Sequence, residues 1–132
     1  MKGLDSSAIL ALLHGDRAIE RTLRSWAGEE IATSELCLIE LTAMLLGKPP
    51  RIRASRLEAL ARLRRRLSVL PVDHRVQAIL AARSGAVTTP GALQMATILA
   101  TLEAAGCDEV LTVGRTPSPI GRWKLRVRCI RG

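Results

Sequence analysis

Short apolar runs alternate with longer amphipathic stretches along this chain. Apolar runs bounded by turn residues are typical of buried strands, and apolar positions repeating every three to four residues are typical of helices. The predicted strands cover residues 1–4, 30–33, 68–72, 109–113 and 125–130. The predicted helices cover residues 8–14, 17–27, 35–46, 51–67 and 74–82, and a last helix runs from 90 to the glycine at 106.

Polar residues that favour helix starts precede several of these helices. Asp16, Ser34 and Asp73 can each cap the helix that follows, and either Ser6 or Ser7 can cap the first one. These caps support the helix boundaries given by the apolar pattern.

The order of elements predicts the fold class. Strands alternate with helices along the whole chain, without an internal repeat or a second domain. This order predicts an α/β fold with a short, mostly parallel β-sheet and helices on both faces, formed as one domain over residues 1–132. The helix 35–46 is apolar nearly all round, so we expect it to be buried. Lys124, Arg126 and Arg128 share one face of the last strand, as in a protected edge strand.

Charge and aromatic content restrict the partners of this protein. The formal net charge is +8, from 20 Lys+Arg and 12 Asp+Glu, which favours anionic partners such as nucleic acid or an acidic protein. A basic protein without such a partner is the alternative. Trp26 and Trp123 are its only aromatic residues, so we do not expect a platform for base stacking, and nucleic-acid contacts would be mostly to phosphates.

Cysteine, histidine and hydropathy patterns argue against several other classes. Three widely spaced cysteines without a C-x-x-C pair, and two histidines, do not make a structural zinc site or a disulfide framework. The uncharged stretch 84–102 contains Gly85, Pro90 and Gly91, which predict a turn and a helix rather than a membrane span. Asp5 interrupts any signal peptide at the start. We expect a cytoplasmic protein with no membrane partner.

Two lone carboxylates in apolar surroundings are the candidate chemistry. Asp5 ends the first strand, and Glu40 lies about a turn and a half into the helix after the second strand. Buried carboxylates are costly unless they are paired or bind a cation, so these residues indicate a metal site or a charge pair. Ligand sites in open parallel sheets form at the carboxyl ends of strands, where Gly91 and Gly114 are also expected.

The segments around these positions resemble a known family. GLDSSAIL at 3–10, ATSELCLIEL at 32–41, GALQMAT at 91–97 and EVLTVGR at 109–115 are similar, in this order, to four motifs of the PIN-domain family. WKLRV at 123–127 is similar to its final strand. Within that family, the chain looks like the small VapC-type toxins of bacterial and archaeal toxin–antitoxin pairs. The resemblance covers essentially the whole chain.

The resemblance implies a PIN-like domain with Mg²⁺- or Mn²⁺-dependent endoribonuclease activity on RNA. It implies that Asp5 and Glu40 are catalytic, metal-binding acids, and it also suggests a homodimer and an antitoxin-like protein partner. Family members carry Asp where this chain has Gly91, and an acid where it has Gly114. Neither glycine can bind a metal through a side chain.

Two interpretations therefore remain open. We expect a degenerate PIN-domain protein with weak or no nuclease activity and no cofactor, acting through RNA or protein binding. The alternative is an active Mg²⁺- or Mn²⁺-dependent endoribonuclease of a toxin–antitoxin pair. Other acids are poor substitutes: Asp108 and Glu109 precede their strand at the opposite end, Asp73 is a helix cap, and Glu35 suits the positive end of its helix.

Each candidate residue also has a structural interpretation. Asp5 could be only the cap of the first helix, although its pairing with Glu40 favours a site. Glu40 could form a buried ion pair with an arginine, or be protonated with a raised pKa. Ser7 and Thr112 could support the acids by hydrogen bonds, or act as a cap and a strand residue. Four arginines are candidate contacts for nucleic acid or a partner, with a solvated face as the alternative: Arg62, Arg65, Arg66 and Arg115.

Overall fold

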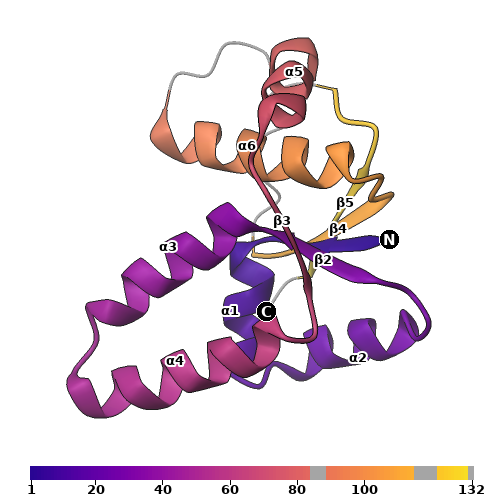
Figure 1. Ribbon diagram of the computed structural model, residues 1–132. Helices are drawn as coiled ribbons and strands as arrows, with labels where there is room; N and C mark the ends of the chain where they lie inside the picture. The colour runs from indigo at the N-terminus through magenta and orange to yellow at the C-terminus, as the bar shows by residue number, and fades with distance from the viewer. Residues whose placement is uncertain (84–88, 115–121, 131–132) are drawn as a thin grey trace.

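The computed structural model describes residues 1–83, 89–114 and 122–130, with strands and helices in alternation (Figure 1). The strands are β1 (Lys2–Leu4), β2 (Ile31–Ser34), β3 (Ser68–Leu70), β4 (Glu109–Val113) and β5 (Arg126–Ile130). The helices are α1 (Ser6–Leu13), α2 (Arg17–Ser25), α3 (Glu35–Leu46), α4 (Pro50–Arg64), α5 (His74–Arg83) and α6 (Pro90–Ala104).

The five strands form one sheet in the order β3-β2-β1-β4-β5, and every pairing is parallel. The register places Leu4 beside Thr33 on one side and Leu111 on the other. The α/β prediction is confirmed, and the sheet is wholly rather than mostly parallel. Since all strands run the same way, Asp5, after β1, and Gly114, after β4, lie at the same edge of the sheet.

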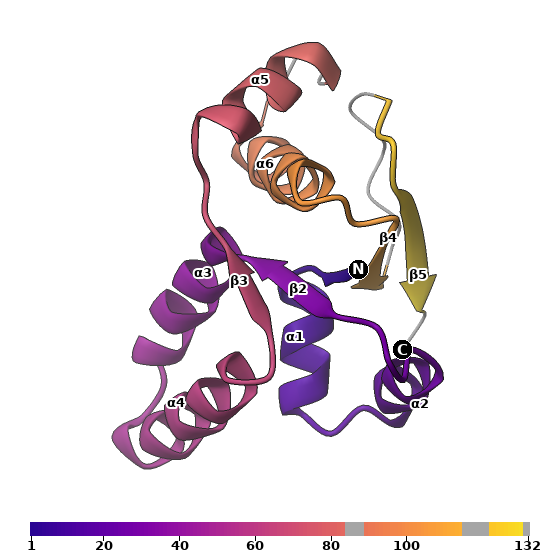
Figure 2. The same cartoon turned by 45° about the vertical axis from the view of Figure 1, so that its right-hand side comes forward.

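Helices cover both faces of the sheet, as predicted. The helices α5 and α6 lie above it, while α1, α2 and α4 lie below, and α3 runs beside the carboxyl edge (Figure 2). The helix α6 approaches β1 closely, because a Cβ atom on Gly3 would come within 2.8 Å of Leu102 Cδ1. Ala96 and Ala100 are also buried on α6.

The core between these layers is aliphatic. Its fully buried members come from both sheet and helices: Leu4, Ile9, Ile19, Leu102, Val110 and Leu111. Burial of such side chains is the main stabilising contribution to the fold, at about 1.5–3 kcal/mol for each fully buried one. The core holds β1 at the centre of the sheet and thereby fixes the position of the residue that follows it, Asp5.

Three local predictions need correction. The first helix begins at Ser6 and its cap is Asp5, so neither serine is the cap. The helix α4 ends at Arg64 instead of residue 67. The helix α3 is not wholly buried: the exposed fraction of Ile39 is 61% and that of Leu46 is 55%, because only one side of α3 packs on the domain.

Other predictions are confirmed or fall outside the described residues. The strand β5 is an edge strand, with Arg126 and Arg128 exposed. In the part of the chain that the structure describes, no helix is long and apolar enough to cross a membrane. Arg115 and the rest of the proline-rich segment up to residue 121 lie outside the described residues.

Candidate acid site

Asp5 caps α1 and also faces the carboxyl edge of the sheet. Its Oδ1 atom accepts hydrogen bonds from the Ala8 backbone N–H at 2.9 Å and from the Ser7 hydroxyl at 2.7 Å. The residue is buried, with only 4% of its surface exposed. The cap interpretation is therefore confirmed. It does not exclude a site, because both hydrogen bonds use Oδ1 and the cap does not use Oδ2.

A chain of hydroxyl groups connects Asp5 to β4. The Ser7 Oγ atom lies 3.1 Å from Thr112 Oγ1 and accepts a hydrogen bond from the Val113 backbone N–H at 2.9 Å. Because the ionised Asp5 carboxylate can only accept, the Ser7 proton points to Asp5, and Thr112 must donate to Ser7. Ser7 thus contacts the acid directly, Thr112 reaches it only through Ser7, and the two hydroxyls tie the carboxylate to the neighbouring strand.

Glu40 projects from α3 toward the same region. Burial raises the pKa of its carboxyl above the ordinary value of 4.5, and the nearby Asp5 carboxylate raises it further. Its Oε1 atom is buried and has no hydrogen-bond partner among the described residues. No Lys or Arg of the described ranges lies within ion-pair distance, so the structure supports a raised pKa and gives no support to an arginine pair.

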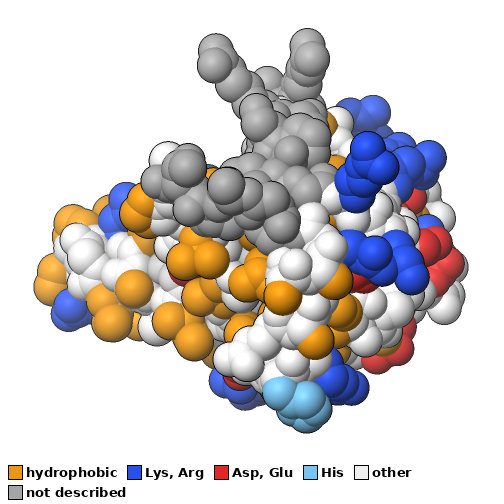
Figure 3. All heavy atoms as spheres, turned by 90° about the horizontal axis from the view of Figure 1, so that it is seen from above, with side chains coloured by type: hydrophobic (Ala, Val, Ile, Leu, Met, Phe, Trp, Pro, Cys, Tyr) orange, Lys and Arg blue, Asp and Glu red, His pale blue; other side chains and the backbone are white. Residues whose placement is uncertain are grey.

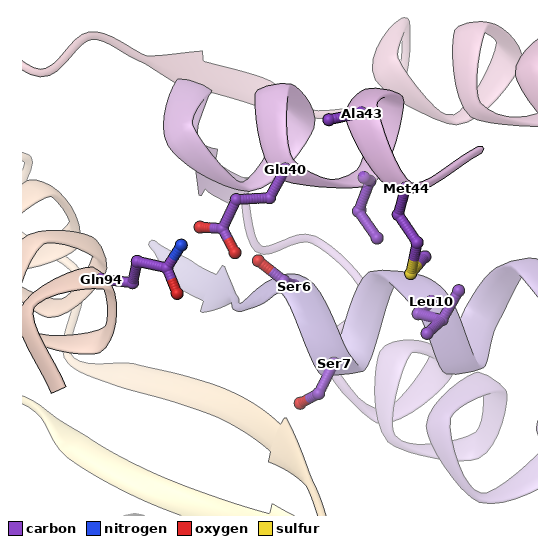
Figure 4. Close-up of a pocket in the computed structure, with 8 residues that line it drawn as sticks. Ser6, Ser7, Leu10, Glu40, Ala43, Met44 and Gln94 are labelled. Carbon is purple, nitrogen blue, oxygen red and sulfur yellow. The ribbon is translucent and has the colours of Figure 1, made fainter. Parts of the chain in front are cut away.

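A groove of about 440 Å³ opens between α1, α3 and α6, with Glu40 on its wall. Ser6, Ser7 and Gln94 supply its other polar side chains (Figure 4). The Glu40 carboxylate points toward Ser6 and toward the Gln94 amide (Figure 4). The remaining lining is apolar: Leu10, Leu41, Ala43 and Met44. The groove is thus acidic and polar at one end and apolar at the other.

Ser6 and Gln94 were not predicted as site residues. Ser6 Oγ, like Glu40 Oε1, is buried without a hydrogen-bond partner among the described residues. Gln94 lies three residues after Gly91 on α6, so both occupy one helix face. That spacing is the signal that could have identified Gln94. Two unsatisfied polar atoms in one groove are unusual for a folded protein and indicate a place for a ligand.

Gly91 and Gly114 differ in their surroundings. Gly91 is the second residue of α6, has no positive φ, and a Cβ atom there would meet nothing within 4 Å. Gly114 has φ +95°, a conformation that L side chains rarely adopt. Its backbone N–H donates to the Ile130 carbonyl at 3.0 Å. An acid could therefore be added at Gly91 without a clash, whereas at Gly114 it would strain the backbone.

The other acids considered from the sequence lie elsewhere. Glu109 pairs in register with Lys2 at the amino edge of the sheet, opposite the groove. Asp73 accepts from the Arg75 backbone N–H at the start of α5, as expected of a cap. Glu35 accepts from the Val72 backbone N–H. Within residues 1–83, 89–114 and 122–130, no three His, Cys, Asp or Glu side chains gather into a metal-binding group.

Comparison with known proteins identifies the family. The PIN domain model matches residues 3–115. This chain belongs to the PIN domain family. The match spans the strand ends that carry Asp5 and Gly114 and the helices that carry Glu40 and Gly91. A comparison with curated proteins finds no match.

Solved structures of low sequence identity share the PIN fold seen here. A chain of VapBC2 from Rickettsia felis, bound to a DNA fragment from its promoter, is similar with a TM-score of 0.76 and 13% identity, over 98% of both chains. A chain of DNA-bound VapBC from Salmonella typhimurium has a TM-score of 0.71 and 17% identity, over 97% of this chain and 96% of that one. A chain of VapBC-5 from Mycobacterium tuberculosis has a TM-score of 0.63 and 23% identity, over 99% of this chain and 98% of that one.

PIN domains generally use divalent metal ions, so the fit of this site to Mg²⁺ can be tested on its oxygen atoms. Mg²⁺ keeps several waters and is bound through one or two carboxylates together with substrate phosphates. Asp5 and Glu40 supply two carboxylates, and the Gln94 amide adds a neutral group. These residues fit one weakly held ion, for which substrate would have to complete the ligand set. When bound, such an ion would supply an activated water and charge stabilisation at phosphorus.

The arginines singled out in the sequence lie away from this PIN-domain groove. Arg62 is on α4, and Arg65 and Arg66 follow it; all three are exposed, and none lines the groove. The structure therefore brings Asp5, Ser7, Thr112 and Glu40 to one edge of the sheet and leaves these arginines elsewhere. A role in RNA or partner contact stays a prediction for them.

Proposed function

We propose that this chain is a PIN-domain protein of the toxin–antitoxin type with a degenerate acid site, and that it acts mainly by binding rather than by cleavage. Its nuclease activity would be weak or nil. The observation that carries the proposal is the acid set: Asp5 and Glu40 are the carboxylates of the site, while Gly91 and Gly114 have no side chain to add.

A protein partner fits the groove. The Glu40 carboxylate has no base beside it in the described residues, and an apolar wall of Leu10 and Met44 continues from it. A basic side chain next to apolar residues would satisfy both ends. Similar PIN structures were solved in complexes named VapBC and FitAcB, which supports an antitoxin-like protein as this partner. RNA is the other candidate ligand, and a cytoplasmic location is part of the proposal.

A second copy of the chain is the other expected partner. Exposed apolar side chains on α3, Ile39 and Leu46, and on α6, Leu93, could be covered in a homodimer. Light scattering at increasing protein concentration tests this. A monomer mass at the highest concentration would remove the homodimer from the proposal and leave the groove partner unaffected.

An active endoribonuclease remains the second candidate, and a specific observation favours it. Glu40 and Asp5 are close enough for one carboxylate to raise the pKa of the other, and neither is neutralised by a Lys or Arg of the described residues. Such a pair is a place where a cation gains binding energy. In this case Mg²⁺ or Mn²⁺ is the cofactor, and Asp5 and Glu40 hold it.

Cleavage of structured RNA with Mg²⁺ or Mn²⁺ separates the two candidates. The native chain, Glu40→Gln, Gly91→Asp and the double change Gly91→Asp with Gly114→Asp are compared. The degenerate protein is inactive, and activity emerges only when Asp is added at position 91. Native cleavage that is abolished by Glu40→Gln would overturn the proposal and establish the active enzyme.

Metal binding gives a second readout that does not need substrate. A ligand that binds only the folded state raises the melting temperature. We expect sub-millimolar Mg²⁺ to leave the native melting temperature almost unchanged and to raise that of Gly91→Asp. A large shift for the native chain, lost in Glu40→Gln, would contradict the degenerate interpretation.

A further inference from the structure

Exposed arginines gather on α2 and α4, away from the acid groove. We call six of them the arginine face: Arg17, Arg21, Arg24, Arg51, Arg62 and Arg65. The first three repeat every three to four residues, so they share one side of α2. All six are exposed, and none lines the groove that holds Glu40.

The two helices belong to the same side of the molecule. Both lie beneath the sheet, beside α1 and opposite α6 (Figures 1 and 2). The Arg56 guanidinium Nη1 atom on α4 donates to the Leu13 carbonyl at the end of α1, at 3.1 Å. Only three residues separate Leu13 from Arg17 at the start of α2. This hydrogen bond therefore joins the middle of α4 to the end of α1, shortly before α2 begins.

Internal ion pairing does not account for these arginines. Within the described ranges, no member of the arginine face has a carboxylate within 4.0 Å, whereas Arg83 pairs with Glu103, and Arg126 with Glu109. The two helices contain one acid each, Glu20 and Glu58. The positive charge on this side of the protein is therefore available to an outside partner.

Helix stabilisation accounts for only some of them: Arg24 and Arg62 lie in the last turns of α2 and α4, whereas Arg17 and Arg51 lie in the first turns. A helix N-terminus carries partial positive charge and favours acids, while cations are favoured at the C-terminus. Arg17 is nevertheless the first residue of α2, and Arg51 is the second residue of α4. A cation at either position costs on the order of 0.3–1 kcal/mol. Their charge is thus kept against a local cost.

The arginine face lacks the apolar centre of a protein interface. The exposed large hydrophobic residues lie mostly on α3, with Leu93 on α6, and α2 has none. On α4 only Ile52 belongs to this class. Hydrophobic side chains are spread over the face of the molecule seen from above (Figure 3). Protein interfaces enclose an apolar or aromatic core with a polar rim. A surface of arginines alone is better matched to phosphates, which guanidinium groups bind by two parallel hydrogen bonds.

Aromatic content indicates which nucleic acid would fit. Binders of single strands stack bases on exposed aromatic rings. Trp26 is the nearest aromatic in sequence, directly after α2, and it is 7% exposed and lies under the Lys2 ammonium. The face contains no aromatic ring, so only guanidinium planes could stack on the bases of a single strand. A duplex presents phosphates outside and needs no stacking.

We propose that the arginine face binds the phosphate backbone of a double-stranded nucleic acid, independently of the acid groove and without sequence preference. The inference does not depend on the proposed function, because it concerns side chains that do not line the groove. Arginine reads phosphate rather than base here, so DNA and RNA duplexes should both bind.

Fluorescence anisotropy with a labelled 20-base-pair duplex of mixed sequence, in a DNA and an RNA form, tests the proposal. The triple variant Arg17→Gln, Arg21→Gln, Arg24→Gln should bind about tenfold more weakly at low salt than the native chain. The slope of log K against log salt should become less negative by about 2–3, since each lost phosphate contact changes it by about 0.9 on DNA.

A control variant that loses the same number of cations elsewhere separates the effect of the arginine face from that of net charge. The variant Arg75→Gln, Arg122→Gln, Lys124→Gln removes three exposed cations outside the face. Its affinity for the duplex should be within about threefold of that of the native chain, and the affinity of Glu40→Gln should equal that of the native chain. Equal losses in both triple variants would overturn the proposal, as would tighter binding of a single strand of equal length. Equal competition by polyglutamate would point instead to an acidic protein and would also overturn it.

Discussion

Glu109 and Glu40 are acids at opposite edges of the same parallel sheet, with opposite electrostatic surroundings. The Glu109 carboxylate is 2.9 Å from Arg126 Nη2, 3.5 Å from Arg128 Nη1 and 3.7 Å from Lys2 Nζ. Glu40 has no such neighbour in the described residues, and the charge that shifts its pKa is the Asp5 carboxylate, which raises it. A chain of net charge +8 thus neutralises one acid with three cations and leaves the other without any.

The difference separates a structural acid from a candidate site. A buried carboxylate with several cations links strands: Glu109 joins β4 to β1 and to the edge strand β5. A carboxylate beside another carboxylate is destabilising in the free protein and becomes favourable only when a cation arrives. The amino edge therefore stabilises the fold, and the carboxyl edge retains negative charge for a ligand.

The largest expected effect is at the amino edge. The substitution Glu109→Ala leaves Arg126 and Arg128 without their carboxylate, while Lys2 keeps Asp108 at 3.0 Å. It should lower the free energy of unfolding by about 2–3 kcal/mol, less than for a fully buried pair because Arg126 is exposed. Urea denaturation measures this. The control Glu58→Ala, on the exposed side of α4, should change the free energy of unfolding by less than about 0.5 kcal/mol. A loss for Glu109→Ala no larger than that for Glu58→Ala would remove the structural role of Glu109.

The next largest effect should be a difference in stability between substitutions at the two glycines of the carboxyl edge. Gly114→Asp places a side chain at φ +95° and should lower the free energy of unfolding by about 1–3 kcal/mol. Gly91→Asp should be close to neutral, because the space is open and an acid suits the first turn of α6, while repulsion from Asp5 and Glu40 offsets that gain. Thermal unfolding without metal compares them. Gly114→Ala should lower the free energy of unfolding nearly as much as Gly114→Asp. A clearly smaller loss for Gly114→Ala would mean that charge repulsion, rather than backbone strain, destabilises Gly114→Asp.

Adjacent serines provide a matched pair. Ser7→Ala removes the donor to Asp5 and the acceptor for the Val113 N–H, so we expect a loss of about 1–2 kcal/mol. Ser6→Ala removes a buried hydroxyl without a partner among the described residues and should change stability by less than about 0.5 kcal/mol. Chemical denaturation of both variants measures the contrast. Equal losses would mean that the hydroxyl chain from Thr112 to Asp5 does not hold the acid.

The sequence predicted the sheet, the helices and the shared edge of Asp5 and Glu40, because parallel strands and apolar periodicity carry that information locally. The sequence offered Asp5, Ser6 and Ser7 as caps of the first helix, and the choice of Asp5 depended on backbone angles, which the sequence does not encode directly. The exposure of Ile39 on α3 depended on how helices pack around the sheet. Gln94 entered the groove through the same packing, and the strain at Gly114 lies in a backbone conformation that composition cannot show.

The smallest and most specific effect concerns Glu40 and pH. Because burial and Asp5 raise its pKa in the folded state, the protonated form is favoured by folding. Its contribution to stability is complete below the unfolded value of 4.5 and is lost as the pH rises through the folded pKa. Glu40→Gln mimics the protonated acid, so it should match the native chain near pH 4 and exceed it at pH 7, by less than about 1 kcal/mol because Glu40 is partly solvated. Unfolding by urea at a series of pH values measures the difference. A variant less stable than the native chain at pH 7 would show that the Glu40 charge is already compensated, and the contrast with Glu109 would then fail.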